Sequence, residues 1–330
     1  MKVSIVVPIY NTSLYIEKCA RSLFEQTHDD IEYIFIDDAS TDDSLARLKT
    51  LLRDNYPQLQ DRVKILCNKQ NIGVALTRSL GMKEVTGDYI IQVDSDDWVE
   101  PDYVESLLNA AESQGLDVVI CDFFYCFGEK QVVTEIEKCA SIDECMSKIL
   151  SGECHGSLCN KLIKTSIIKE HSIFPEPHLR ILEDKLVVLS VLSHAKKIGY
   201  VCRPLYYYNR FNLGYSTFQT KVMLIPSFTL ATQLLIERYG SEPVSSVIYD
   251  GLQFHKAIVL GHILLYSQEL SKEKLELFHD LPVKHIIKHP VSPFYYKLIG
   301  VFYKLRLTLF VSMMRGILRF IKNDVSCKVV

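Results

Sequence analysis

An acidic segment at residues 92–98, with the sequence Gln-Val-Asp-Ser-Asp-Asp-Trp, constrains the fold of this chain most strongly. It follows residues 89–91, an apolar run typical of a buried parallel strand. The strand therefore delivers Asp94, Asp96 and Asp97 to its carboxyl end. Open α/β sheets bind their ligands at that edge. Because neighbouring carboxylates repel one another, we expect a cation among them.

A hard divalent ion, Mg²⁺ or Mn²⁺, fits this segment, with Asp96 as the predicted metal ligand. Such ions prefer carboxylate oxygens and leave coordination positions for the phosphates of a ligand. A calcium loop of the EF-hand type is excluded. If it began at Asp94, its glycine position would hold Val99 and one of its oxygen-ligand positions would hold Trp98. The other interpretation is a solvated acidic turn before the helix that Pro101 begins.

Predicted strands and helices alternate strictly over the first part of the chain. The predicted strands are residues 3–9, 31–36, 63–66, 89–93 and 118–121. The segments between them carry apolar residues at helical spacing. This alternation predicts an α/β fold in which a mostly parallel, Rossmann-like sheet has helices on both faces.

The alternation loosens after residue 121. A hairpin is predicted around Gly128, and helices are predicted at residues 141–150 and 182–194. Further strands are predicted at residues 161–164, 197–202 and 204–208. After residue 222 we find only long apolar helical runs. We therefore predict a domain at 1–220, made of halves 1–121 and 122–220, and a helical C-terminal region at 221–330.

The composition is that of a globular protein rather than a disordered one, with 48% hydrophobic and 23% charged residues. The formal net charge of −3 gives no reason to expect nucleic acid as a partner. Ten cysteines are scattered along the chain, several of them in apolar runs, and the N-terminus lacks the pattern of a secretory signal. These features predict free thiols and a cytoplasmic location.

Polar residues follow several of the predicted strands. The loops are Pro8-Ile9-Tyr10-Asn11, Asp37-Asp38, Asn71-Ile72-Gly73 before Arg78, and Asp94-Ser95-Asp96-Asp97. The carboxyl ends of parallel strands meet at one edge of a sheet, so these loops are expected to converge. An aromatic side chain, several carboxylates, a metal site and a guanidinium together suit a nucleotide diphosphate.

The combination of segments resembles glycosyltransferase family 2. The segments that carry the resemblance are residues 3–11, 36–42, 71–73, 87–90 and 94–97, and more weakly 160–162, 182–184, 195–198 and 205–208. This resemblance implies a GT-A fold, with a nucleotide-sugar-binding half at 1–121 and an acceptor half at 122–220. It also implies inverting transfer of a sugar from a nucleotide diphosphate donor, usually a UDP-sugar, to a glycan or lipid-linked acceptor.

Carried over position by position, the resemblance makes Asp184 the catalytic base and Asp96 the ligand of the metal that bridges the two phosphates. It implies that Asp37 holds the base of the nucleotide and that Asp94 contacts the ribose. The full donor-side set is Pro8, Tyr10, Asn11, Asp37, Asn71, Gly73, Arg78, Asp94 and Ser95. The acceptor-side set is Trp98, Asn160, Lys161 and Glu183.

Two positions depart from the family pattern. The usual Ala-Arg-Asn is Thr77-Arg78-Ser79 here, and Leu182 replaces an aromatic residue before the Glu-Asp pair. A phosphoacceptor signalling domain would place its acid pair after the first strand, and a nucleotidyltransferase would need a glycine-rich basic loop there; this chain has neither. A non-catalytic sugar-nucleotide-binding protein of the same fold stays the alternative.

The C-terminal region is basic and aromatic. No acidic residue lies between Asp280 and Asp324, and its longest uncharged run, 307–314, is far shorter than the roughly 20 residues of a spanning helix. Lysines and arginines interleaved with Phe and Tyr are typical of a helix in the membrane interface that faces anionic lipid. Such a helix would place the protein peripherally on the inner face of the cell membrane. A helix that packs on the catalytic domain is the other interpretation.

Overall fold

The computed structural model describes residues 1–210, 223–241, 243–267, 269–307, 309–314 and 316–317, and it divides into two compact units. The first unit comprises residues 1–142 and 156–218, and the second comprises 143–155 and 219–330. The short segment 143–155 thus groups with the C-terminal helices. We describe each unit separately.

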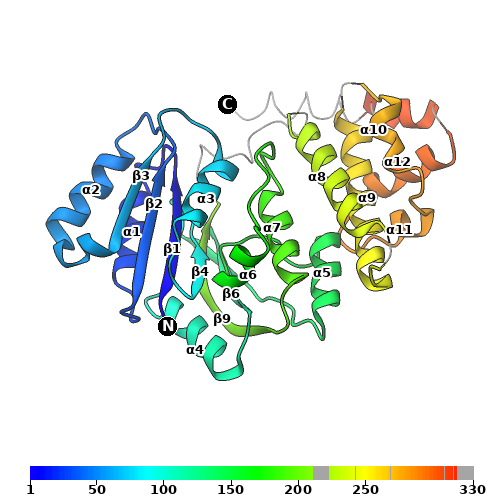
Figure 1. Ribbon diagram of the computed structural model, residues 1–330. Helices are drawn as coiled ribbons and strands as arrows, with labels where there is room; N and C mark the ends of the chain where they lie inside the picture. The colour runs from blue at the N-terminus through cyan, green and yellow to red at the C-terminus, as the bar shows by residue number, and fades with distance from the viewer. Residues whose placement is uncertain (211–222, 242, 268, 308, 315, 318–330) are drawn as a thin grey trace. The chain divides into compact units, whose positions relative to one another are not determined.

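The first unit is built around a mixed sheet. Its strands are β1 (Val3–Ile9), β2 (Ile31–Asp37), β3 (Val63–Cys67), β4 (Tyr89–Gln92), β5 (Trp98–Val99), β6 (Val118–Phe127), β7 (Lys130–Thr134), β8 (Lys161–Lys164) and β9 (Ile198–Asn209). Within the described residues the order is β3-β2-β1-β4-β8-β6-β9-β5, with β7 paired to β6. β1 to β4 are parallel to one another, so the predicted donor loops leave one edge of the sheet (Figure 1).

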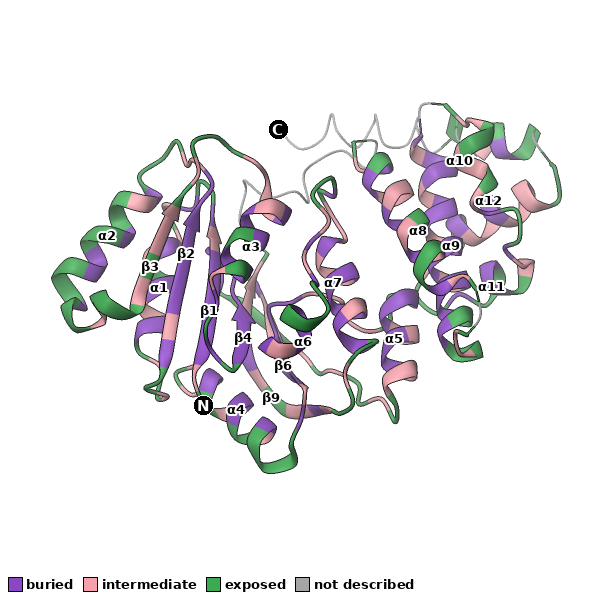
Figure 2. Ribbon diagram, viewed as in Figure 1, coloured by how far each residue is buried: buried purple, intermediate pink, exposed green. Residues whose placement is uncertain are grey.

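Helices cover both faces of this sheet. They are α1 (Ile16–Phe24), α2 (Ser44–Asn55), the 3-10 helix η1 (Pro57–Arg62), α3 (Val74–Lys83), α4 (Tyr103–Gln114), α6 (Thr165–Glu170) and α7 (Glu183–Leu192). One buried cluster joins Ile5 of β1 to Leu23 of α1 and Leu107 of α4. On the other face α3 packs closely, because a Cβ added at Gly81 would lie 2.5 Å from the side chains of Val6 and Ile36. Figure 2 shows the resulting burial of β1, β2 and β4.

The predicted α/β fold with a mostly parallel sheet is confirmed, but two details differ. The strands predicted at 197–202 and 204–208 form one continuous strand, β9. A register shift between Cys121 and Asp122 takes up the extra residues ahead of Pro204, whose nitrogen has no hydrogen to donate. The two-residue strand β5 was not predicted, because so short a segment shows no alternation.

The second unit consists of helices in its described part. They are α5 (Ile142–Ser151), α8 (Ile225–Tyr239), α9 (Ser246–Tyr266), α10 (Lys272–Glu276), α11 (Val283–Ile287) and α12 (Phe294–Lys304). The central helix is α9, whose Leu260 and Ile263 share a buried core with Phe278 and Ile299. Gly261 lets Tyr296 of α12 approach closely, since an added Cβ would lie 2.6 Å from its ring. Among the described residues, no helix has both the length and the apolar character needed to cross a membrane.

Candidate active site

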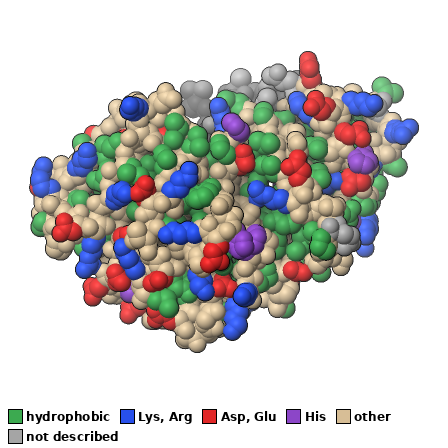
Figure 3. Space-filling view, viewed as in Figure 1, with side chains coloured by type: hydrophobic (Ala, Val, Ile, Leu, Met, Phe, Trp, Pro, Cys, Tyr) green, Lys and Arg blue, Asp and Glu red, His purple; other side chains and the backbone are tan. Residues whose placement is uncertain are grey.

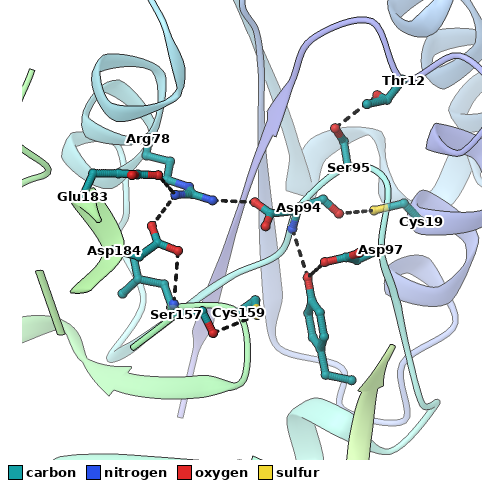
Figure 4. Close-up of polar contacts among 12 residues, drawn as sticks. Thr12, Cys19, Arg78, Asp94, Ser95, Asp97, Ser157, Cys159, Glu183 and Asp184 are labelled. Atoms are coloured by element: carbon teal, nitrogen blue, oxygen red, sulfur yellow. Dashed lines mark hydrogen bonds and ion pairs between the residues drawn. The ribbon is translucent and has the colours of Figure 1, made fainter. Parts of the chain in front are cut away.

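The acidic loop after β4 is held from behind by β9. The backbone N–H of Asp94 donates to the hydroxyl of Tyr206 at 3.2 Å, and this hydroxyl donates to the carboxylate of Asp97. The other oxygen of Asp97 accepts the backbone N–H of Asn209 at 2.7 Å. Asp97 therefore anchors the loop, and Figure 4 shows its carboxylate, with a marked polar contact, beside Asp94. Neither Tyr206 nor Asn209 was predicted as a site residue, because they lie over a hundred residues away from the loop.

A buried guanidinium brings the two ends of the predicted site together. Arg78 projects from α3, and one of its nitrogens lies 2.6 Å from Asp94. Another lies 2.9 Å from Glu183 and also pairs with Asp184, both in the first turn of α7 (Figure 4). The Arg78 side chain is only 4% exposed. The protein thus supplies one cation among these carboxylates itself, and it joins the predicted donor acid to the predicted base.

The two acids of α7 that contact Arg78, Glu183 and Asp184, are held against ionisation. Burial raises the pKa of Asp184, opposed by Arg78 and reinforced by the charge of Asp94. Burial also raises the pKa of Glu183, and the neighbouring charge of Asp184 adds to that effect. One guanidinium therefore does not offset the desolvation of these two carboxylates.

The same holds for the anchoring acid of the loop. The pKa of Asp97 is raised well above its usual range, first by burial and then by the charges of Asp96 and Asp94. Two donated hydrogen bonds lower it without reversing the shift. The loop carries more negative charge than its surroundings neutralise, so a further cation would stabilise it.

Asp96 lies at the middle of this loop and is 4% exposed. Among the residues that the structure describes, no three or more His, Cys, Asp or Glu side chains are grouped as a ready-made metal site. A Mg²⁺ or Mn²⁺ ion commonly binds one or two carboxylates and completes its shell with substrate phosphates and water. Asp96 in an electronegative loop fits such an ion, with the donor providing the remaining oxygens.

The loop after β1 borders the loop after β2. Asn11 has a left-handed φ of 52°, and its side-chain oxygen accepts the backbone N–H of Thr41 at 2.8 Å. Tyr10 is 47% exposed, Pro8 is half-buried and Asp37 is buried at the end of β2. The structure therefore brings these four predicted donor-side residues to the same edge of the sheet, with Asn11 tying the loops together.

Asp38 orders the loop that contains Asn71 and Gly73. Its carboxylate accepts the backbone N–H groups of Ile72 and Gly73, each at 2.9 Å, and the side-chain amide of Asn68 at 2.8 Å. Gly73 has a φ of 87°, which a residue with a side chain rarely adopts. Sequence reasoning did not assign Asp38 a role. In the sequence, Asp38 is marked only as the second residue of an acid pair. The residues around it do not indicate which of the two acids faces the neighbouring loop.

The start of α1 fixes the acidic loop from a third side. Ser95, predicted on the donor side, is buried and accepts a hydrogen bond from the hydroxyl of Thr12 at 3.1 Å. The thiol of Cys19 lies 3.6 Å from the carbonyl oxygen of Asp94 (Figure 4). These contacts make the loop conformation largely pre-set, which favours precise placement of the carboxylates.

Two predicted acceptor-side residues are buried behind the site. Asn160 donates from its side-chain amide to the carbonyl of Cys121 at 2.7 Å. The ammonium of Lys161 donates to the carbonyl of Ser157 at 2.7 Å and to the side chain of Asn160 at 2.8 Å. They hold the loop whose Leu158 N–H reaches Asp184 at 3.4 Å. In this structure both residues support the predicted base from inside the fold.

Trp98, also predicted on the acceptor side, lies in an aromatic stack. Its ring stacks on Tyr207 with centroids 5.3 Å apart, and Tyr207 stacks on Phe124 at 4.6 Å. The ammonium of Lys18 sits 3.0 Å from the centre of the Trp98 ring. The stack fastens β5 to β9 and α1, directly after the acidic loop.

Comparison with known proteins gives consistent matches. The model of the family described as Glycosyl transferase family 2 matches residues 4–171. EpsH of Bacillus subtilis, named as a glycosyltransferase, is 32% identical over 62% of this chain and 60% of its own length. Glycosyltransferase GlyG of Streptococcus pneumoniae is 29% identical over 63% of this chain and 70% of its own. The chain thus matches under two thirds of EpsH.

Solved structures share the fold. The crystal structure of Staphylococcus aureus TarS 1–349 in complex with UDP-GlcNAc has a TM-score of 0.68 at 18% identity, covering 98% of this chain and 92% of that one. The mannosyltransferase PcManGT from Pyrobaculum calidifontis, in complex with GDP-Man and Mn²⁺, has a TM-score of 0.57 at 12% identity. The match covers 99% of this chain and 88% of the PcManGT chain. The predicted GT-A type of fold is therefore confirmed.

Proposed function

We propose that this chain, which belongs to glycosyl transferase family 2, is a glycosyltransferase that moves a sugar from a UDP-sugar to a glycan or lipid-linked acceptor with inversion at the anomeric carbon. The observation that carries the proposal is the Arg78 network, which holds Asp94 at the donor loop and Asp184 at the start of α7 in one cluster. TarS, a protein of similar fold, has been solved in complex with UDP-GlcNAc, which supports a UDP-sugar as the donor.

The reaction we propose is a single displacement. A hydroxyl of the acceptor attacks the anomeric carbon of the donor sugar, and the bond from that carbon to the diphosphate breaks, so UDP leaves. Asp184 accepts the proton of the attacking hydroxyl. General base catalysis of this kind typically contributes about 10²–10⁴-fold. Arg78 and the N–H of Leu158 orient the carboxylate, which retains lone pairs for the proton.

The donor would lie along the edge formed by the loops after β1, β2 and β4. In this proposal Asp37 accepts hydrogen bonds from the uracil, Pro8 and Tyr10 line its pocket, and Asp94 contacts the ribose. The half-exposed ring of Tyr10 supports this, because it offers an open aromatic surface beside the buried Asp37. Asn11, Asn71, Gly73, Arg78 and Ser95 complete the set and shape the loops.

For the cofactor we propose Mn²⁺ or Mg²⁺ held by Asp96. When bound, such an ion stabilises the negative charge on the departing diphosphate. The burial of Asp96 in a loop that also carries Asp94 and Asp97 supports this assignment, because such a loop offers carboxylate oxygens to a cation. The loop contacts made by Tyr206 and Thr12 would hold Asp96 in place with or without the ion.

We also propose that the protein is cytoplasmic and sits peripherally on the inner face of the cell membrane through its C-terminal helices. In α12 and beyond, Phe294 is 77%, Leu309 84% and Phe310 47% exposed, while Tyr296 is buried. Some aromatic side chains of the C-terminal region are thus buried in the core, whereas others are exposed to solvent. Three of the basic residues that motivated the idea, at 315, 319 and 322, lie outside the described residues.

Flotation with liposomes tests the membrane proposal. We expect the full chain to float with vesicles that contain anionic lipid at low salt, and a double variant Leu309→Ser, Phe310→Ser to float much less. Equal flotation of both proteins, or none of either, would remove the membrane from the proposal without touching the catalytic part.

The transfer itself is tested by incubating the protein with a panel of nucleotide sugars and Mn²⁺ and measuring release of the nucleotide diphosphate. We expect hydrolysis of at least one UDP-sugar above background. The α- or β-configuration of the released sugar, read by NMR at early times, should be opposite to that of the donor. Retention of configuration, or binding of UDP-sugars without any turnover, would contradict the proposal; the latter would indicate a non-catalytic binding protein.

A further inference from the structure

One face of β6 and β9 carries a run of aromatic rings that begins at the acidic loop. The register of these parallel strands pairs Phe123 with Tyr206 and Tyr125 with Tyr208. Side chains two residues apart on a strand point to the same face, so these four rings share one face of the sheet. Its first member, Tyr206, contacts both Asp94 and Asp97 through its hydroxyl. The face therefore leads outward from the candidate active site.

The rings become more exposed along this face. Phe123 and Tyr206 are buried, Tyr125 and Tyr208 are half-buried, and Phe127 is 49% exposed. The centroids of Tyr125 and Tyr208 lie 5.7 Å apart, and those of Tyr125 and Phe127 lie 6.3 Å apart. A continuous aromatic surface that opens to solvent beside an active site is typical of a ligand-binding surface.

Arg210 adds a positive charge to the same surface. Its guanidinium carbon lies 5.4 Å from the ring centre of Tyr125 and 5.7 Å from that of Tyr208. Its backbone N–H donates to the carbonyl of Cys126 at 2.8 Å, which ties the end of β9 to β6. Among the described residues, no carboxylate lies within ion-pair distance of its guanidinium. The charge is therefore available to an anionic ligand.

Resting on the glycosyl transfer proposed above, we propose that Tyr125, Phe127, Tyr208 and Arg210 form the acceptor subsite, and that it binds a sugar or polyol chain that carries phosphate or carboxylate groups. Aromatic faces bear negative charge density and attract the C–H faces of such chains. A guanidinium matches phosphate and carboxylate with two parallel hydrogen bonds. The subsite thus combines an apolar platform with an anion contact, next to the loop that holds the donor.

A second copy of this chain is the competing occupant, because β7 pairs only with β6 among the described strands and exposes Val132 and Val133. The charge of Arg210 favours the anionic chain. A self-association face built on these rings would instead need a partner acid, and the hairpin turn between Phe127 and Lys130 offers just Glu129. Light scattering of the wild-type protein separates the two: a dimer that Phe127→Ala converts to monomer would overturn the proposal.

Direct binding tests the subsite. Wild-type protein with saturating UDP and Mn²⁺ is applied to an array that holds ribitol phosphate hexamer, hexagalacturonate and the neutral maltohexaose. We expect at least one anionic chain to bind tenfold or more tightly than maltohexaose. Arg210→Gln should weaken that binding at least tenfold, and Phe127→Ala about threefold or more.

Matched controls are Arg53→Gln and Tyr249→Ala, which remove an exposed arginine and an exposed aromatic ring elsewhere. Both should bind the array like the wild type, and calorimetry should give the same UDP affinity for all five proteins. The subsite is overturned if maltohexaose binds as well as the anionic chains, if no chain binds, or if Arg210→Gln matches Arg53→Gln. Absence of UDP binding by the wild type would instead contradict the proposed function.

Discussion

Half-buried and buried carboxylates at the two ends of the parallel strands, here called the amino and carboxyl edges of the sheet, have opposite pKa shifts. At the amino edge, Glu32 of β2 accepts hydrogen bonds from Ser4, from the backbone and hydroxyl of Thr86, each at 2.6 Å, and from Lys2 at 2.7 Å. Burial alone would raise its pKa, but these donors lower it to about 2. At the carboxyl edge, Asp97 and the Glu-Asp pair of α7 have raised pKa values despite the donors they contact.

The opposite pKa shifts indicate that the carboxylates of the amino edge contribute to stability, whereas those of the carboxyl edge serve function. A carboxylate whose pKa is lowered on folding stabilises the folded state near neutral pH, whereas one whose pKa is raised destabilises it. The amino edge is therefore built to hold β1, β2 and β4 together, while the carboxyl edge stores unfavourable charge that a cationic or proton-donating ligand can relieve. Perturbed acids of this kind are typical of active sites. On the face shown in Figure 3, by contrast, acidic and basic side chains are interspersed.

The largest expected effect is at the carboxyl edge. Asp96→Ala should abolish sugar transfer, because it removes the proposed ligand of the ion that would neutralise the diphosphate. The variant should keep the wild-type fold, because Thr12, Tyr206 and Asn209 hold the loop through other residues. Product formation and thermal unfolding are the two measurements.

Asp54→Ala removes an exposed acid on α2 and serves as the matched control, with transfer unchanged. Full activity of Asp96→Ala, or full wild-type activity in EDTA, would show that the metal assignment is wrong.

The opposite edge should respond in the opposite way. Glu32→Gln should lower the free energy of unfolding by about 2–3 kcal/mol, because the amide cannot accept all the donated hydrogen bonds. Its kcat for transfer should stay within about twofold of the wild type. The measurements are urea unfolding at pH 7 and a transfer assay. A variant that loses kcat but keeps its stability would show that Glu32 has a role in catalysis rather than in folding.

The pH dependence of stability follows from the same pKa shift. Folding lowers the pKa of Glu32 from its ordinary value of 4.5 to about 2. Its contribution is therefore full above about pH 4.5 and is lost as the pH falls towards 2, because the unfolded chain binds the proton first. Urea midpoints measured between pH 3 and 6 should fall more steeply with acid for the wild type than for Glu32→Gln. Parallel curves would contradict the role of Glu32.

The smallest effect is expected from Lys2→Met. The ammonium of Lys2 is more exposed than Glu32, with side-chain exposures of 37% and 16%, and the ion pair is correspondingly screened. Removing it should cost less than about 1 kcal/mol. A cost as large as that of Glu32→Gln would mean that the ion pair, rather than the hydroxyl and backbone donors, stabilises the amino edge.

The sequence predicts the first half of the fold well and the site only in part. Strands such as residues 3–9 are buried on both faces and therefore read as apolar runs, and the acids that follow them lie at one edge as expected. The anchoring of Asp97 by Tyr206 could not be predicted, because the partners lie 109 residues apart and depend on how β9 enters the sheet.

The sequence also does not show which polar residues are buried or what they contact. Asn160 and Lys161 form a polar pair in a family-like motif, and only the three-dimensional structure shows that both are buried and bonded to backbone carbonyls. Arg78 was expected to face phosphate, but its position among three carboxylates depends on α7 folding back beside α3. Local patterns identify residue types, whereas burial and long-range partners decide what those residues contact.

The central claim is that Asp184, held by Arg78 at the carboxyl edge of the sheet, accepts the proton of the acceptor. It is tested most directly by Asp184→Asn, with UDP-sugar affinity from calorimetry and turnover from UDP release measured on one preparation. The account predicts donor affinity within about threefold of the wild type and a fall in kcat of at least about 10²-fold. Unchanged turnover, or loss of donor affinity in proportion to the loss of rate, would contradict it.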